Sequence, residues 1–189
     1  RAWSSDKAGR VDAAQVLAGA ATPPNIPRPE VLEQALLAGR ILAHAQGFRL
    51  LHAASDAHDW SLDLARIAQI WRAGCIIRSA LLDDLAAAFH SGVSGGDLLQ
   101  STSIQQLLAE TIGGLRQVVA AAALAGLPVP ALAAALSWYD STRQARGTAN
   151  LIQAQRDIFG AHGFQRTDAE GPVHADWNGS GDRDREGDN

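Results

Sequence analysis

The chain has 189 residues, and its 16 Lys and Arg against 20 Asp and Glu give a formal net charge of −4 at pH 7. That length fits one domain, and a composition that is 47% hydrophobic and 19% charged can bury a core, which excludes a disordered polyelectrolyte. The acidic balance argues against a nucleic-acid partner, because binding to a phosphate backbone rests on clustered Lys and Arg. We find no unbroken apolar run of membrane-spanning length and no signal peptide, and therefore expect a cytoplasmic protein with no membrane partner.

Three further features of the composition bear on the class of protein. The sequence contains no Met and begins with Arg1, so we expect it to be a piece of a longer or processed polypeptide. Cys75 is the only cysteine and lies in an apolar run without a neighbouring His, which favours a small buried side chain over a nucleophile. No His-x-x-x-His or Cys-x-x-Cys spacing occurs, and we therefore expect no metal site.

The first half of the chain predicts helices joined by a proline-rich link. Residues 1–17 favour a helix without a clean apolar period, and AATPPNIPR (20–28) predicts a rigid link because proline disfavours helix. Pro29 can occupy the first turn of a long amphipathic helix, whose apolar residues recur every three or four positions from 31 to 51. Ser61 is a candidate N-cap for a helix over 62–72, and another helix is predicted over 76–89, before the glycine-rich residues 91–96.

The second half continues the helical pattern and then loses it. A helical period over 103–125 is followed by Gly126 and two prolines, which together form a helix stop. Pro130 can open the next helix, through Tyr139, and residues 149–159 predict one more that stops at Gly160. No segment alternates long enough for a strand, so the predicted fold class is all-α. We expect a helical domain over 1–166 and an extended or disordered tail over 167–189, where Gly, Pro and charge dominate.

The segment NLIQAQRDIFGAH (150–162) contains the candidate site. Arg156 and His162 lie six residues apart across the helix stop, so a guanidinium and an imidazole could converge from a helix end and the loop after it. Such a pair suits an anionic, hydroxylated ligand. The alternative is that Arg156 pairs with Asp157 or another nearby acid and that His162 only packs, because surface ion pairs are common.

Four segments, HAQGFRLL (44–51), IWRAGCIIRSALL (70–82), ALSWYDSTR (135–143) and ANLIQAQRDIFGAH (149–162), occur with a characteristic order and spacing. In this order and spacing they resemble the C-terminal helical domain of the decarboxylating 6-phosphogluconate dehydrogenases. The start of the chain is also similar to that family's R-x-x-S-S-x-K-x-x-R stretch. GFQRTDAEGPVHADW (163–177) is similar to the segment with which the family crosses its dimer. The resemblance implies the multi-helix fold of that domain, with an extended C-terminal tail.

The resemblance implies an enzyme of the pentose phosphate pathway and of gluconate utilization. Such an enzyme oxidises 6-phosphogluconate with NADP, loses CO2 and releases ribulose 5-phosphate. The family's catalytic lysine and glutamate, and its dinucleotide-binding domain, precede the stretch that this chain resembles, and no G-x-G-x-x-G motif occurs here. We therefore expect no catalytic residue in this chain and no activity from the chain alone.

Three residues resemble the family's substrate-binding set. Arg1 resembles the arginine that holds the substrate phosphate, and Arg156 and His162 resemble the pair that reaches into the partner subunit's substrate site, which implies a homodimer. A phosphate dianion suits permanently charged, forked donors, so the chemistry agrees with this role. The alternative function is a helical dimerisation module that kept the fold and lost the chemistry. A packing module needs none of these three residues, and their presence together favours the enzyme.

Overall fold

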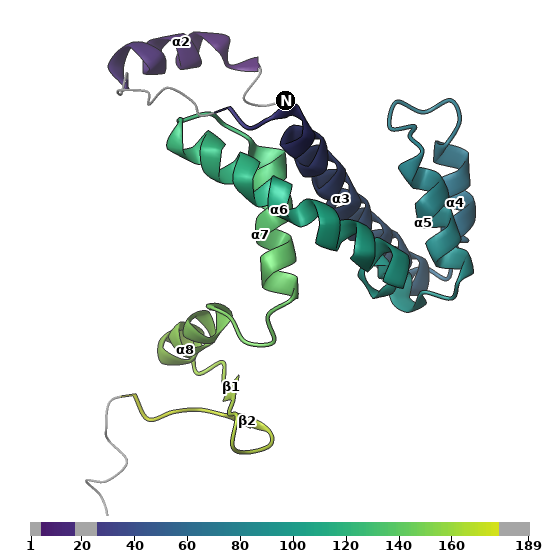
Figure 1. Cartoon of the computed structure of the whole chain (residues 1–189). Helices are drawn as coiled ribbons and strands as arrows, with labels where there is room; N and C mark the ends of the chain where they lie inside the picture. Colours follow the sequence, from purple (N-terminus) through teal and green to yellow (C-terminus); the bar gives the residue numbers. More distant parts are fainter. Residues whose placement is uncertain (1–4, 18–25, 178–189) are drawn as a thin grey trace, which may run out of the picture. The chain divides into compact units, whose positions relative to one another are not determined.

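The computed structural model describes residues 5–17 and 26–177, which fold almost entirely as helices (Figure 1). The predicted all-α class is confirmed. Two compact units divide the chain, residues 1–139 and residues 140–189, and the boundary between them falls within a helix. The expected boundary between a helical domain and a tail, after residue 166, differs from the boundary between these two units and stays a prediction.

The described elements of the first unit are helices and 3-10 turns. They are α2 (Lys7–Val16), α3 (Pro29–Ala57), α4 (Leu64–Trp71), α5 (Leu81–His90), the 3-10 turns η1 (Ser94–Gly96) and η2 (Leu98–Gln100), α6 (Thr102–Leu124) and most of α7 (Pro130–Thr142). The second unit holds α8 (Ala149–Gly160) and a small antiparallel ribbon of β1 (Phe164–Gln165) and β2 (Pro172–Val173). The sequence predicted no strand, because a two-residue strand carries no readable alternation.

Helix α3 begins as predicted, with Pro29 in its first turn and Glu30 beside it, where a carboxylate faces the positive end of the helix dipole. It continues to Ala57, beyond residue 51, the last of the apolar positions that predicted it. Its buried positions recur every three or four residues and include Ala38, Ile41 and Phe48. This spacing lines one face of the helix for packing against a neighbour.

Helix α6 is that neighbour, and it lies along α3. Ile104, Leu108 and Leu115 are buried in the shared core. The helix ends where predicted, because Gly126 takes a φ of 67° just beyond it and the amide of Leu127 donates to the carbonyl of Ala122 at 2.8 Å. By length and composition alone, α6 is also long and apolar enough to cross a membrane. Its buried side chains pack on α3.

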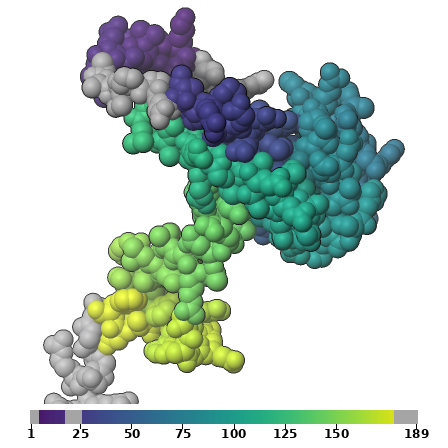
Figure 2. Space-filling view, in the orientation of Figure 1, coloured from purple at the N-terminus to yellow at the C-terminus, as the bar shows by residue number. Residues whose placement is uncertain are grey.

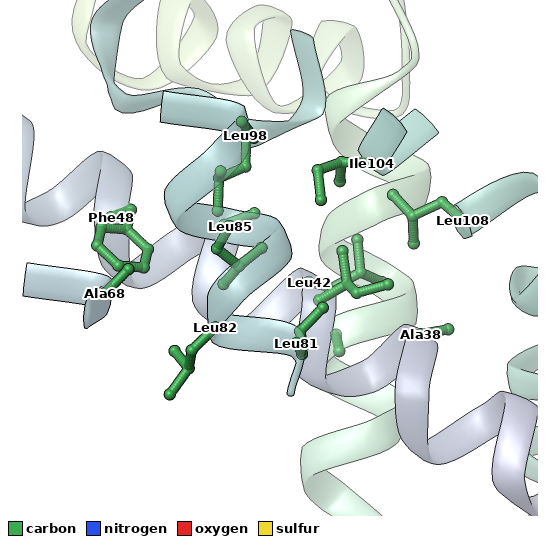
Figure 3. Packing of buried hydrophobic residues seen from close by; sticks show 14 of the residues in the cluster. Ala38, Leu42, Phe48, Ala68, Leu81, Leu82, Leu85, Leu98, Ile104 and Leu108 are labelled. Carbon is green, nitrogen blue, oxygen red and sulfur yellow. The ribbon is translucent and has the colours of Figure 1, made fainter. Parts of the chain in front are cut away.

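The core of the first unit draws side chains from α3, α4, α5, η2 and α6 (Figure 3). Phe48 is fully buried, and its ring lies 5.3 Å from that of Trp71 and 4.8 Å from that of Phe89. On the face seen in Figure 2 the side chains of α3 to α6 are continuous with each other. Aromatic and aliphatic groups from separate helices therefore form one apolar cluster.

Helices α4 and α5 pack on each other, and two predictions about them were wrong. The N-cap of α4 is Asp63, whose Oδ1 accepts the amide of Arg66 at 2.9 Å, whereas Ser61 has a φ of 51° in the turn before it. The helix expected from residue 76 begins only at Leu81, and residues 76–80 form turns. Periodic apolar residues in 76–80 predicted helix, although Ile76 is fully exposed.

Cys75, which the sequence predicted to be buried, and Trp60 are both more open than the core side chains. Cys75 is half-buried in the turns between α4 and α5. Trp60 is exposed and stacks on His58, with the ring centroids 4.9 Å apart. Trp71 and Trp138 pack against the core of the first unit.

Candidate functional site

Two of the three predicted site residues, Arg156 and His162, lie on the C-terminal part of α8 and just after it, in the second unit. A helix brings residues three, four and seven positions apart onto one face, and on α8 this face holds Asn150, Gln153, Ala154 and Asp157. Asp157 is the buried member of the face. Arg156, next in sequence to it, therefore points away from this face.

Arg156 is exposed, and its Nη1 donates to the Oε1 of Gln153 at 3.2 Å, one turn earlier. The alternative that Arg156 pairs with Asp157 is wrong, because the Asp157 carboxylate is buried among other donors. A neutral amide leaves the charge of the guanidinium uncompensated. Arg156 thus keeps its positive charge and its remaining donors available for an anion.

His162 follows the end of α8 in an exposed loop. The helix ends at Gly160 as predicted, and the left-handed residue that turns the chain is Ala161, with φ 50° and ψ 38°. The imidazole folds back over the helix end, because a Cβ placed on Gly160 would lie 2.8 Å from the Nε2 of His162. Arg156 and His162 therefore share the last turn of α8 and the loop after it. Arg1 lies outside the described residues.

Asp157 is the buried polar residue of this unit, and its role was not predicted from the sequence. Its Oδ1 accepts the amide of Gly163 at 2.8 Å and the Nδ1 of His174 at 2.9 Å. Its Oδ2 accepts the amide of Ala175 at 3.0 Å and the Nε1 of Trp177 at 2.8 Å. Four donors from beyond the helix thus converge on one carboxylate whose exposed fraction is 0%.

The charge state of Asp157 follows from these contacts. Burial by itself raises the pKa of the carboxyl, but the donors from Ala175, His174, Trp177 and Gly163 outweigh it and hold the pKa well below its usual value. An ionised carboxylate only accepts hydrogen bonds. The Nδ1 of His174 must therefore carry a proton, which defines the tautomer of a neutral His174.

A cavity of about 790 Å³ lies beside the helix face that carries Asn150 and Gln153. Its volume is in the range of small-molecule sites. Arg146, Arg166 and Trp177 also line it, but Arg156 and His162 do not. The positive charge of Arg166 is compensated by Asp168. The hydrogen bond from Arg166 lowers the pKa of the Asp168 carboxyl to about 2. The predicted pair of residues is thus separate from the walls of this cavity.

The opposite face of α8 is exposed and carries four large apolar side chains around Gln155. Leu151, Ile152, Ile158 and Phe159 are all exposed there, and Phe159 keeps 86% of its surface. Arg156 lies one turn from both Ile152 and Phe159, so the guanidinium borders this face. Large apolar side chains grouped on one exposed helix face are typical of an interaction surface.

Comparison with known proteins gives a consistent result. A family model described as 6-phosphogluconate dehydrogenase, C-terminal domain, matches residues 1–177. The decarboxylating 6-phosphogluconate dehydrogenase of Salmonella typhimurium is 45% identical over 177 residues, which make up 92% of this chain and 38% of that protein. The enzyme of the same name from Dictyostelium discoideum is 42% identical over 198 residues, covering 96% of this chain and 39% of that protein.

A solved structure agrees with the sequence relatives. It is the Plasmodium falciparum 6-phosphogluconate dehydrogenase, known in its apo form and in complex with its cofactor NADP+ and with its substrate 6-phosphogluconate. It matches 90% of this chain with a TM-score of 0.83 at 33% identity, and the match covers 38% of that structure. The chain thus spans under two fifths of the length of these relatives. It belongs to the family of 6-phosphogluconate dehydrogenase C-terminal domains.

Proposed function

We propose that this chain is the C-terminal, substrate-side part of an NADP-dependent 6-phosphogluconate dehydrogenase of the cytoplasm. The reaction is the oxidative decarboxylation of 6-phosphogluconate to ribulose 5-phosphate. The observation that carries the proposal is the exposed, uncompensated Arg156 beside the loop of His162, in a chain matched to this family over residues 1–177. The Arg156 guanidinium and the His162 imidazole bind the phosphate end of the substrate, with Arg1 as a third donor.

The chemistry of these side chains supports binding more than proton transfer. A guanidinium stays charged at all physiological pH values and offers a planar fork of donors that matches a phosphate. An exposed imidazole can add a further donor beside it. None of these roles breaks a covalent bond, so the residues orient the substrate and the catalytic groups belong to the rest of the enzyme.

The residues described here do not fit the main site for NADP. A dinucleotide binds at the carboxyl ends of parallel strands, with its pyrophosphate at a helix N-terminus. The described strands are two-residue segments of one antiparallel ribbon, without such a crevice. NADP is therefore assigned to a part of the enzyme other than the described residues. The described residues contribute contacts to the substrate only.

A homodimer is part of the proposal. The uncovered face of α8, with Leu151, Ile152, Ile158 and Phe159, supports an interface with a second copy, because each copy then buries apolar surface that is otherwise in water. Arg156 borders that face. A guanidinium at the rim of the interface can reach a substrate held by the partner subunit.

The experiment uses the product of the complete open reading frame that encodes this chain, here called the full-length protein. It should reduce NADP+ in the presence of 6-phosphogluconate. Arg156→Ala should weaken 6-phosphogluconate binding by about one to two decades, since a charge-assisted contact is worth roughly 1.5–3 kcal/mol, and leave the melting temperature unchanged. Arg156→Lys should recover only part of the loss, because an ammonium lacks the planar fork.

The matched control is Arg166→Ala, which removes an exposed arginine already compensated by Asp168. It should leave substrate affinity near that of the wild type. A lowered melting temperature with unchanged substrate affinity in Arg156→Ala would overturn the site assignment. A full-length protein that dimerises without any dehydrogenase activity would favour the alternative, a helical dimerisation module.

A further inference from the structure

Asp157 holds the backbone on both sides of His162. The amide of Ala161, just before it, donates to the main-chain oxygen of Asp157 at 2.8 Å. The amide of Gly163, just after it, donates to the Oδ1 of the same residue at 2.8 Å. His162 is therefore the middle of a short loop whose two flanking amides both bind one residue.

Arg156 immediately precedes Asp157 near the end of α8. The end of α8 thus holds the guanidinium of Arg156. Hydrogen bonds from the same part of the helix hold the loop of His162. The side chain of His162 then folds back over Gly160, where a Cβ would meet its Nε2 at 2.8 Å. The spacing of the two donors depends on Asp157 without Asp157 facing a ligand.

The other two contacts extend this dependence to the end of the described chain. Oδ2 of Asp157 accepts the amide of Ala175 and the indole N–H of Trp177, and Oδ1 also accepts from His174. These donors lie 17 to 20 residues beyond Asp157. A buried carboxylate is stable only when donors surround it, so release of the 174–177 segment leaves Asp157 with the Gly163 amide alone.

We propose that Asp157 is a positioning residue for anion binding. It sets His162 against Arg156, and it does so only while the 174–177 segment is bound to its carboxylate. Neither Asp157 nor the 174–177 segment touches the ligand. The proposal rests on the proposed function, in which Arg156 and His162 bind the substrate phosphate.

The test substitutes the carboxylate and one of its donors in the full-length protein. In Asp157→Asn the amide NH2 replaces one oxygen and faces N–H donors, so either the Gly163 amide or the Ala175 and Trp177 donors lose their acceptor. Trp177→Phe is the milder variant, because it removes one donor and keeps a ring beside Phe164. The matched control is Asp168→Asn. Asp168 is an exposed acid whose carboxylate forms an ion pair with Arg166.

Three measurements are made on each variant. The Kd of 6-phosphogluconate should rise by roughly three- to tenfold in Asp157→Asn and less in Trp177→Phe, while the Kd of NADP+ stays constant. Hydrogen exchange of residues 158–163 should become faster in both variants. The effects of Asp157→Asn and His162→Ala on the Kd of 6-phosphogluconate should fall short of additivity, because Asp157 acts through His162. Asp168→Asn should change none of these quantities.

Each outcome decides between the two proposals. If Arg156→Ala and His162→Ala raise the Kd but Asp157→Asn does not, or if its effect adds fully to that of His162→Ala, the positioning role is overturned and the proposed function stands. If neither Arg156→Ala nor His162→Ala raises the Kd, the proposed function fails and the positioning role with it. Should Asp157→Asn not fold, Trp177→Phe decides by the same criteria.

Discussion

Gly114 of α6 lies against Gln34 of α3 so closely that a Cβ on the glycine would come to 2.6 Å from the Cβ of Gln34 and to 3.0 Å from the main-chain oxygen of Val31. The two longest helices of the first unit approach each other at this point. Neighbouring Gly113 is exposed, and a Cβ there would meet nothing within 4 Å. The two adjacent glycines therefore differ: Gly114 is needed for the close packing of the helices, whereas Gly113 faces open space.

This difference predicts opposite effects of the same substitution. Gly113→Ala should stabilise the protein by up to about 1 kcal/mol, because alanine favours helix and finds open space. Gly114→Ala should destabilise it by roughly 1–3 kcal/mol, because the added methyl must push α3 away from α6. Urea unfolding of both variants measures the two free energies. Equal effects would show that Gly114 is not a contact point.

Acid should weaken the C-terminal segment through Asp157. The pKa of this carboxyl is lowered in the folded state, so its contribution to stability is complete above the unfolded pKa of about 3.9 and is lost as pH falls towards the folded value. The free energy of opening at the Gly163 amide, measured by native-state hydrogen exchange, should therefore decline below about pH 4.

Asp157→Asn provides the comparison for this pH dependence. The variant lacks the titrating group, so its opening free energy should be lower at pH 7 and should change little on acidification. The gap between the wild type and the variant should narrow below about pH 4. A constant gap from pH 7 to pH 3 would contradict an ionised carboxylate at the centre of these contacts.

The uncovered face of α8 predicts self-association. Phe159→Glu should weaken dimerisation of the full-length protein by about tenfold or more, because burying a phenylalanine side chain is worth roughly 1.5–3 kcal/mol. Sedimentation across micromolar concentrations measures the dimer constant. Val16→Glu is the control, since Val16 on α2 is 83% exposed against 86% for Phe159. A wild type that remains monomeric would refute the homodimer.

The 189-residue chain by itself should show no dehydrogenase activity. The reason is chemical, because the described residues include neither a dinucleotide crevice nor an assigned catalytic acid or base. Mixing the chain with 6-phosphogluconate and NADP+ should give no rise in absorbance of the reduced nicotinamide. A rise that scales with the amount of chain would mean that this part carries the chemistry.

Local patterns were sufficient for most of the helices. The apolar period of α3 and α6, Pro29 at a helix start and Gly126 after a helix end are each defined by residues within a few turns of one another. Backbone hydrogen bonds in a helix join residues four positions apart, so short-range sequence carries their signal. The same patterns failed at residues 76–80, where apolar residues with a helical period lie in turns and Ile76 is exposed.

The sequence also identified Arg156 and His162 as candidates, because their residue types and their spacing across a helix stop are local features. The role of Asp157 was decided only by the tertiary structure. Its partners lie up to 20 residues away, in a segment whose polar composition predicted a tail without fixed contacts. A buried carboxylate and an exposed one look alike in sequence. They differ only once the folded chain brings four donors to the same two oxygens. These hydrogen bonds offset the free-energy cost of burying the charge.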